Sequence, residues 1–335
     1  MLTLAFLMQL AATSTPPSGD TVGYWQQRVH YRIAATLDEP TATLHASGTL
    51  VYVNNSPDTL REFYVHQYLN AFRPHSKWSE SDAREGRVRF QNLKDPDFGF
   101  ERFTAPTSVR FSDSGEWVAL APVYPGAPDS TVVRFALPRA LAPRDSMTVR
   151  FAWDARVSTV PRRQGRRGRH YDFAQWFPKV AVYDRGGWQH NPLIPAGEFY
   201  GEFGTYDVTL TVRDDQVIGS TGVPVGGDPG WERVKRWGAV FPAARPAAAD
   251  DTVSAVDTPP GFKSVRWVAE RVHHFGWSVS PDYMFEGAAY IRKDSTREAS
   301  SVPAFDTVPI YVLYRPGDEK EWGNGAVVRL SLIHI

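Results

Sequence analysis

Two alternating stretches near the N-terminus decide the fold class: Val29-His30-Tyr31-Arg32-Ile33-Ala34-Ala35-Thr36-Leu37 and Leu44-His45-Ala46-Ser47-Gly48-Thr49-Leu50-Val51-Tyr52. In both, apolar residues recur at every second position, which is the period of a strand with one buried face. The turn residues Asp38-Glu39-Pro40 follow the first stretch. Together the two stretches predict a β-hairpin.

The same period of two recurs along the rest of the chain, and no 12-residue window keeps a helical period throughout. Further strands are predicted at 60–69, 109–111, 117–120, 132–137, 147–153, 206–212, 217–218, 265–268, 275–279 and 310–313. Residues 73–105 are polar and irregular, with a helical turn expected near 79–87. The 26 glycines and 26 prolines mark many turns. The pattern predicts an all-β chain built from large twisted antiparallel sheets.

Composition narrows the function classes. The 335 residues contain 37 basic and 37 acidic side chains, so the formal net charge is zero. Domains that bind nucleic acid by bulk charge are strongly basic, and we therefore expect no nucleic-acid partner. The chain contains no cysteine, which excludes disulfides, thiolate zinc sites and a cysteine nucleophile.

The N-terminus carries a targeting signal. Residues 2–12 are mostly apolar and are followed by Thr13-Ser14-Thr15-Pro16-Pro17. This run is too short to span a bilayer and resembles the core of a secretory signal peptide. We therefore expect residues 1–17 to be a signal-peptide remnant, export to the periplasm or the extracellular space, and no transmembrane helix.

Motifs for metal binding and for nucleophilic catalysis are absent from the sequence. No H-E-x-x-H, G-x-S-x-G, G-x-G-x-x-G or P-loop pattern occurs. His273 and His274 are adjacent, and adjacent side chains of a strand point to opposite faces, so a structural role is expected for them. The nearby carboxylates Glu198 and Glu202 need not converge in an extended segment. We therefore expect no metal site and no catalytic residue within this chain.

Residues 162–169 contain five arginines, in the order Arg162-Arg163-Gln164-Gly165-Arg166-Arg167-Gly168-Arg169. Such a run is compatible with a contact to an anion or to nucleic acid. It is also compatible with a solvated loop, which the zero net charge favours.

An aromatic-rich segment contains the most unusual pattern, and it includes one isolated amide, Gln175. It reads Tyr171-Asp172-Phe173-Ala174-Gln175-Trp176-Phe177-Pro178-Lys179-Val180-Ala181-Val182-Tyr183-Asp184. Gly197-Glu198-Phe199-Tyr200-Gly201-Glu202-Phe203-Gly204 follows it. A glutamine buried among aromatic rings needs a hydrogen-bond partner.

These strings resemble the N-terminal domain of the aminopeptidase N family of zinc metallopeptidases, in its bacterial exported branch. The same resemblance extends to residues 52–60, 69–72, 206–222 and 271–282. The resemblance covers residues 24–325. It implies a saddle-like β-sandwich domain at 18–290, the start of a thermolysin-like catalytic domain at 291–329, and a non-native tail at 330–335. Gln175 matches the family glutamine that helps to hold the free amine of the peptide substrate. Phe177 stands where the family often has glutamate, so strict aminopeptidase specificity does not follow.

The resemblance implies that the chain is the N-terminal fragment of a zinc-dependent peptidase. Zinc would belong to the intact parent enzyme, and the partners would be a peptide substrate and the chain's own catalytic domain. This fragment would supply part of the substrate pocket and should be inactive alone. The alternative is a non-catalytic β-sandwich module that binds peptide or glycan.

Overall fold

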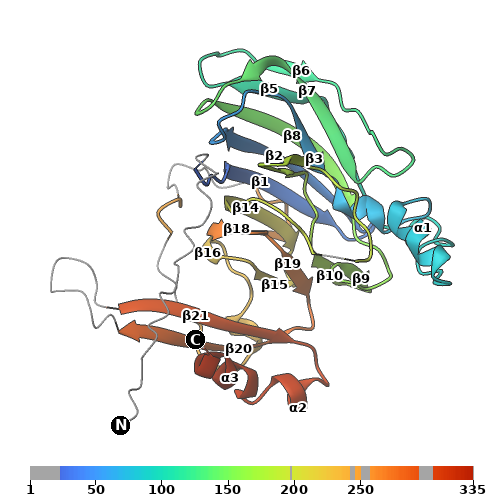
Figure 1. Ribbon diagram of the computed structural model, residues 1–335. Coiled ribbons are helices and arrows are strands. Elements are labelled where there is room, and N and C mark those ends of the chain that lie inside the picture. The colour runs from blue at the N-terminus through green and yellow to red at the C-terminus, as the bar shows by residue number, and fades with distance from the viewer. Residues whose placement is uncertain (1–22, 197, 242–245, 250–256, 294–304, 335) are drawn as a thin grey trace, which may run out of the picture.

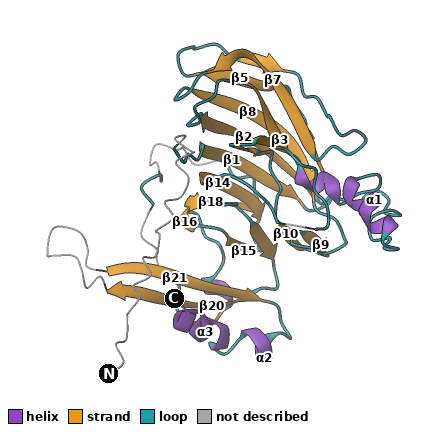
Figure 2. Ribbon diagram, viewed as in Figure 1, coloured by secondary structure: helices purple, strands orange, loops and turns teal. Residues whose placement is uncertain are grey.

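The computed structural model describes residues 23–196, 198–241, 246–249, 257–293 and 305–334. The expected signal segment 1–17 lies outside these residues. Figures 1 and 2 show an assembly dominated by strands, with helices only at its edges. The all-β prediction is confirmed. None of the helices in the described ranges has the length and hydropathy needed to cross a bilayer.

A nine-stranded sheet forms the upper part of the molecule (Figure 1). Its order is β16 (Val223–Gly226), β18 (Phe262–Val272), β14 (Gly204–Arg213), β1 (Arg28–Asp38), β2 (Thr43–Val53), β8 (Ser146–Arg156), β5 (Thr107–Phe111) and β6 (Val118–Leu120), with β4 (Phe100–Phe103) also paired to β8. The predicted hairpin is β1–β2, which pairs Leu37 with Leu44 and Tyr31 with Leu50. Its alternating apolar residues are buried, as the period required.

Two pairings depart from the antiparallel prediction, since β17 (Lys235–Gly238) and β20 (Met284–Lys293) run parallel, and so does one pair in the large sheet. Strands β1 and β14 run parallel, with Val29 opposite Gly204 and Thr36 opposite Thr211. More than 160 residues separate the two strands along the chain, so no tight turn constrains their direction. The period of two reports which side chains are buried, and it carries no information about strand direction.

Smaller sheets cover the large one. One has the order β11 (Lys179–Val180), β3 (Leu60–His66), β7 (Val132–Leu141), and another has β15 (Val217–Ser220), β19 (Trp277–Ser280), β10 (His170–Phe173), β9 (Gly165–Arg167). Strands β12 (Val182–Asp184) and β13 (Gly187–Gln189) form a hairpin. The rings of Phe103 and Phe135 meet edge to face at 5.8 Å, and Phe103 stacks on Phe151 at the same distance. These contacts join β7 to the large sheet as the two layers of a sandwich.

A further three-stranded sheet lies below the rest (Figure 1). It contains β17 (Lys235–Gly238), β20 (Met284–Lys293) and β21 (Phe305–Tyr314), and α2 (Glu319–Trp322) and α3 (Ala326–His334) follow it. Trp231 connects this layer to the main core, because its ring lies 4.2 Å from that of Tyr311 and 5.2 Å from that of Phe285. The helical turn expected near 79–87 is α1 (Lys77–Arg84).

Several predicted strands have different limits in the structure, and two of these differences follow from side-chain hydrogen bonds. The strand expected at 60–69 ends at His66 and continues as a 3₁₀ turn over Tyr68–Ala71. This turn lets the buried Asn70 amide donate to the carbonyls of Glu101 and Ser130, at 2.8 and 2.9 Å. The strand expected from Phe275 starts at Trp277, because the Phe275 carbonyl accepts a side-chain hydrogen bond instead of a strand partner.

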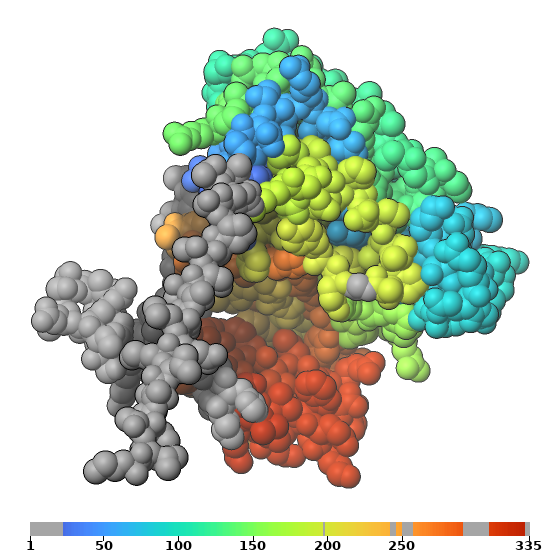
Figure 3. All heavy atoms as spheres, viewed as in Figure 1, coloured from blue at the N-terminus to red at the C-terminus, as the bar shows by residue number. Residues whose placement is uncertain are grey.

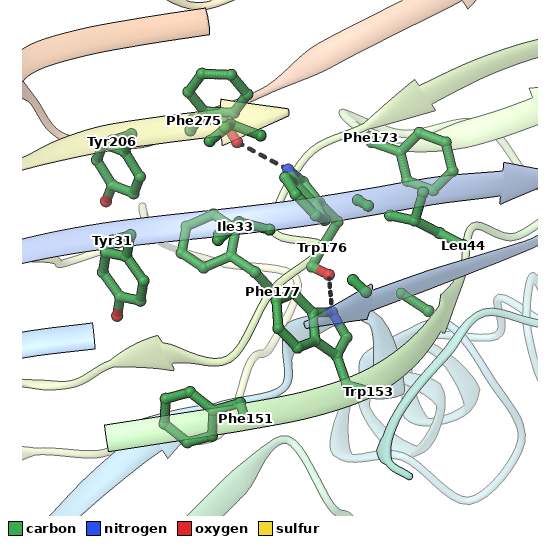
Figure 4. Close-up of a cluster of buried hydrophobic side chains, with 14 of the residues drawn as sticks. Tyr31, Ile33, Leu44, Phe151, Trp153, Phe173, Trp176, Phe177, Tyr206 and Phe275 are labelled. Carbon is green, nitrogen blue, oxygen red and sulfur yellow. Dashed lines mark hydrogen bonds between the residues drawn. The ribbon is translucent and has the colours of Figure 1, made fainter. Parts of the chain in front are cut away.

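The core centres on Trp176, which Figure 4 shows between the large sheet and the connection that carries Phe275. The Trp176 indole N–H donates to the Phe275 carbonyl at 3.0 Å. The Trp176 carbonyl accepts from the indole N–H of Trp153 on β8, also at 3.0 Å. Both indole side chains are almost fully buried. Trp176 therefore links its own segment by hydrogen bonds to β8 and to the connection that carries Phe275, both of which are distant in sequence.

Trp176→Ala should lower the free energy of unfolding by about 3–5 kcal/mol, because it empties a large buried volume and leaves the Phe275 carbonyl without its donor. Urea denaturation followed by circular dichroism measures this change. Trp322→Ala is the matched control, since that side chain is 50% exposed, and it should cost less than about 1 kcal/mol. Equal losses in the two variants would contradict this account of the core.

Candidate functional site

Gln175 lies in the connection between β10 and β11, and its backbone is unusual. Its φ angle is +54°, in the left-handed region that residues with a Cβ rarely adopt. Its backbone N–H donates to Nε2 of His274 at 2.8 Å. The residue is 6% exposed, and its carboxamide has no hydrogen-bond partner among the described residues. Gln175 is therefore held firmly through its backbone, while its amide group is uncommitted.

The hydrogen bond from the Gln175 backbone N–H defines the protonation state of His274. A ring nitrogen that accepts must be unprotonated, so His274 is neutral and carries its hydrogen on Nδ1. Burial lowers the pKa of His274 well below its usual value, and the charges of Lys179 and His273 lower it further. The ring stacks on Phe177 with centroids 5.3 Å apart. This neutral imidazole fixes the conformation of the chain at Gln175.

Phe177 belongs to the core. Its side chain is fully buried and meets the rings of Tyr31 and Tyr206 edge to face, at 5.1 and 5.7 Å (Figure 4). A carboxylate placed among these rings would lose its hydration without gaining a charge partner. The aromatic residue at this position is therefore a packing group.

His273 and His274 lie in the connection between β18 and β19, outside a strand, and their side chains still diverge. His274 packs in the core, whereas the half-buried His273 ring contacts Phe203 at 5.7 Å and lines a surface hollow. The His273 carbonyl accepts a hydrogen bond from Lys179 Nζ at 2.7 Å. The two imidazoles do not converge on one point.

Lys179 and Glu202 form a buried pair of titratable groups that the sequence patterns did not single out. Burial lowers the pKa of Lys179 to about 8, against the opposing effect of the Glu202 carboxylate. Burial raises the pKa of Glu202 to about 7, with the charge of Asp184 acting in the same direction. A lysine and a glutamate that titrate this close to neutrality are a common sign of a functional site.

The hollow beside this pair has a volume of about 590 Å³. Glu202 lines it together with Tyr183, Tyr200, Phe203 and His273. Gly201 allows Lys179 to approach, because a Cβ at position 201 would lie 2.3 Å from Lys179 Nζ. Gln175 does not line this hollow, but it is connected to it through the His273–His274 segment.

Glu198 and Glu202 point to different environments. The exposed Glu198 carboxylate receives both terminal nitrogens of Arg163, at 2.6 and 2.7 Å, whereas Glu202 is buried near Lys179. Arg169 of the arginine run binds Glu39 and Asp215 in the same bidentate manner. Two of the five arginines in this run are thus neutralised by carboxylates from other parts of the chain.

No group of three or more histidine, cysteine or acidic side chains able to hold a metal ion occurs in the described part of the chain. The family resemblance assigns zinc to the catalytic domain of the intact parent enzyme, so these residues do not test that expectation.

No protein-family model matches the chain, and no curated protein matches it. Similar solved structures include a two-domain M1 zinc metallopeptidase variant bound to L-tryptophan, with 14% identity and a TM-score of 0.47 over 93% of this chain and 54% of that chain. The M1 zinc metallopeptidase from Deinococcus radiodurans shows 13% identity and a TM-score of 0.47, over 93% and 53%. This chain thus spans about half the length of these structures. The identity is too low for residue roles to be transferred from them.

Glu202 should make stability depend on pH. Its pKa is raised in the folded state, so between about pH 4.5 and 7 the folded chain keeps a proton that the unfolded chain releases. Glu202 should therefore contribute a fall in the free energy of unfolding as the pH rises through this window, by about 1.4 kcal/mol per unit of pKa difference. Buried histidines such as His274, whose folded-state pKa is lowered, contribute a rise over the same window. Glu202→Gln should remove only the fall, so in urea denaturation curves at several pH values its unfolding free energy should rise more steeply with pH than that of wild type.

Glu198→Gln is the control, because it makes the same chemical change four residues away at an exposed ion pair. It should leave the fall in place. If the free energy of unfolding had the same dependence on pH in wild type and in Glu202→Gln, the raised pKa assigned to Glu202 would be contradicted.

Proposed function

We propose that this chain is the N-terminal, substrate-binding part of a zinc-dependent peptidase of the aminopeptidase N family. In this proposal Gln175 contributes to the peptide pocket, and its carboxamide oxygen accepts a hydrogen bond from the protonated α-amine of the substrate. Residues 18–290 form the β domain, residues 291–329 begin the catalytic domain and residues 330–335 are a non-native tail. The parent enzyme binds zinc in that catalytic domain.

The observation that carries the proposal is the backbone of Gln175. A glutamine with positive φ costs folding free energy that a glycine would not, on the order of 1 kcal/mol. Strained residues persist where the surrounding structure overrides the cost, and they cluster at binding and catalytic sites. The Trp176 hydrogen bonds and the neutral His274 supply that constraint here.

The chemistry of the side chain supports the same role. A carboxamide offers one acceptor oxygen and two donor hydrogens, and those of Gln175 have no partner in the described ranges. A protonated amine is a strong donor, and a hydrogen bond to a charged group contributes about 1.5–3 kcal/mol. The aromatic frame would keep the carboxamide in one orientation, so little conformational entropy is lost when a substrate binds.

The proposal includes export from the cell. The apolar run in residues 2–12 and the small residues after it support a signal peptide, and an exported parent enzyme would act on extracellular or periplasmic peptides. The absence of cysteine is compatible with this location, since the fold needs no disulfide.

Gln175→Gly tests the proposal most directly, because glycine accepts a φ of +54° without strain. In the intact gene product, kcat/KM for a tripeptide with a free amine should fall about 10- to 100-fold, at about 1.4 kcal/mol per tenfold. The stability of the variant should stay the same or rise by up to about 1 kcal/mol. Gln175→Ala should show the same kinetic loss without the gain in stability.

Arg144→Gly is the matched control, since Arg144 also has positive φ, at +67°, and lies in an exposed turn. Arg144→Gly should also keep or raise the stability, but it should leave kcat/KM for the tripeptide unchanged. Normal kinetics in Gln175→Gly would assign the residue a structural role.

Sequencing of the gene beyond residue 329 supplies a separate test, because an H-E-x-x-H motif there supports a peptidase and a stop codon supports a non-catalytic binding module.

A further inference from the structure

A hollow with a volume of about 1160 Å³ lies between the arginine run and the C-terminal layer. In Figure 3 this boundary is visible as a notch between the red C-terminal elements and the yellow-green surface above them. Its charged and aromatic lining includes Arg162, Arg166, Arg167, Arg315, Asp318 and Trp322. We call this hollow the arginine cleft.

The arginines of the run divide into two groups. Arg163 and Arg169, which are bound by carboxylates, do not line the cleft. Of the arginines that line it, Arg166 and Arg315 have only distant carboxylate partners at 3.9 Å, whereas no ion pair of Arg162 or Arg167 occurs in the described residues. Arg162 donates only to the neighbouring Pro161 carbonyl, at 3.3 Å, and Arg167 has no partner among the described residues.

Arg166 is the most enclosed of the three. It donates to the Pro96 carbonyl at 2.7 Å and lies 3.9 Å from the Asp97 carboxylate. Its Nε is buried and has no hydrogen-bond partner in the described residues. A guanidinium in this state has donor capacity left for a ligand.

The opposite side of the cleft adds another cation. Arg315, at the end of β21, is 3.9 Å from Asp318, a distance too long for a hydrogen bond. The other acidic group of the lining, Asp172, already accepts from His170 Nε2 at 2.9 Å and from Ser278 Oγ at 2.5 Å. Four guanidinium groups and two carboxylates therefore line the cleft, with Asp172 already engaged and with Asp97, outside the lining, 3.9 Å from Arg166.

Size and lining restrict the class of ligand. The cleft is much larger than a single phosphate or carboxylate, and Pro161, Leu313 and the half-exposed Trp322 give it apolar surface. Nucleic acid is disfavoured because the chain has no net charge and because Tyr283 and Tyr314 are too buried to stack on bases. A peptide with acidic side chains suits both the arginines and the apolar surface.

We propose that the arginine cleft binds an acidic peptide segment. The carboxylates pair with Arg162, Arg166, Arg167 and Arg315, and the peptide backbone and apolar groups lie along Pro161 and Trp322. This site is independent of the proposed role of Gln175, because Gln175 does not line the cleft. It requires neither the zinc centre nor peptidase activity.

The test uses the full 335-residue chain and fluorescence anisotropy with a labelled octapeptide of alternating Glu and Gly. The double variant Arg162→Gln/Arg167→Gln should weaken binding about tenfold, since each exposed charge pair contributes up to about 1 kcal/mol. The matched control Arg163→Gln/Arg144→Gln removes the same charge outside the cleft and should change affinity less than twofold. Binding should also shift the indole ¹H–¹⁵N resonance of Trp322, assigned with Trp322→Phe.

Two further ligands test whether the cleft recognises the carboxylates of a peptide. The octapeptide with Gln in place of Glu should bind at least tenfold more weakly, and an eight-residue oligothymidine should bind more weakly than the acidic peptide. The proposal is overturned if the control variant loses as much affinity as the cleft variant, if the neutral peptide binds equally well, or if the oligothymidine binds more tightly. Absence of binding at millimolar acidic peptide would overturn it as well.

Discussion

The hydrogen bonds at Trp176 are the constraint on which the rest of this structure depends. The buried indole N–H of Trp176 donates to the Phe275 carbonyl, which avoids the cost of an unsatisfied donor in the core. The Trp176 carbonyl in turn satisfies the indole of Trp153. Strand β8, the 173–177 segment and the β18–β19 connection must therefore meet at one place, which positions the smaller sheets against the large one.

The same constraint creates the local chemistry. Because the chain is fixed on both sides of residue 175, Gln175 can be held in a left-handed conformation, and His274 must stay neutral to accept its N–H. Beyond His274, the buried Lys179 is satisfied by the His273 carbonyl and lies near Glu202. Packing thus brings an uncommitted amide, a neutral imidazole and a titratable pair into one continuous region.

Charge is distributed less evenly than the zero net charge suggests. Arg163 and Arg169 form bidentate pairs with carboxylates from distant segments, and these pairs hold surface loops in place. Arg162 and Arg167, in the same short run, face a hollow in which acidic partners are few. Within one short sequence motif, some arginines are therefore paired with carboxylates and others line a hollow.

The sequence by itself determined the all-β class and the buried face of most strands, because a period of two directly reports which side chains leave water, as at Tyr31 and Leu50 on the β1–β2 hairpin. It also marked Gln175 as an isolated amide among aromatic rings. Only the tertiary structure decided the parallel pairing of β1 with β14, the Lys179–Glu202 pair and the partners of each arginine. These features depend on contacts between residues far apart in the chain. A local pattern fixes which residues are buried, and it does not specify which distant residue each one meets.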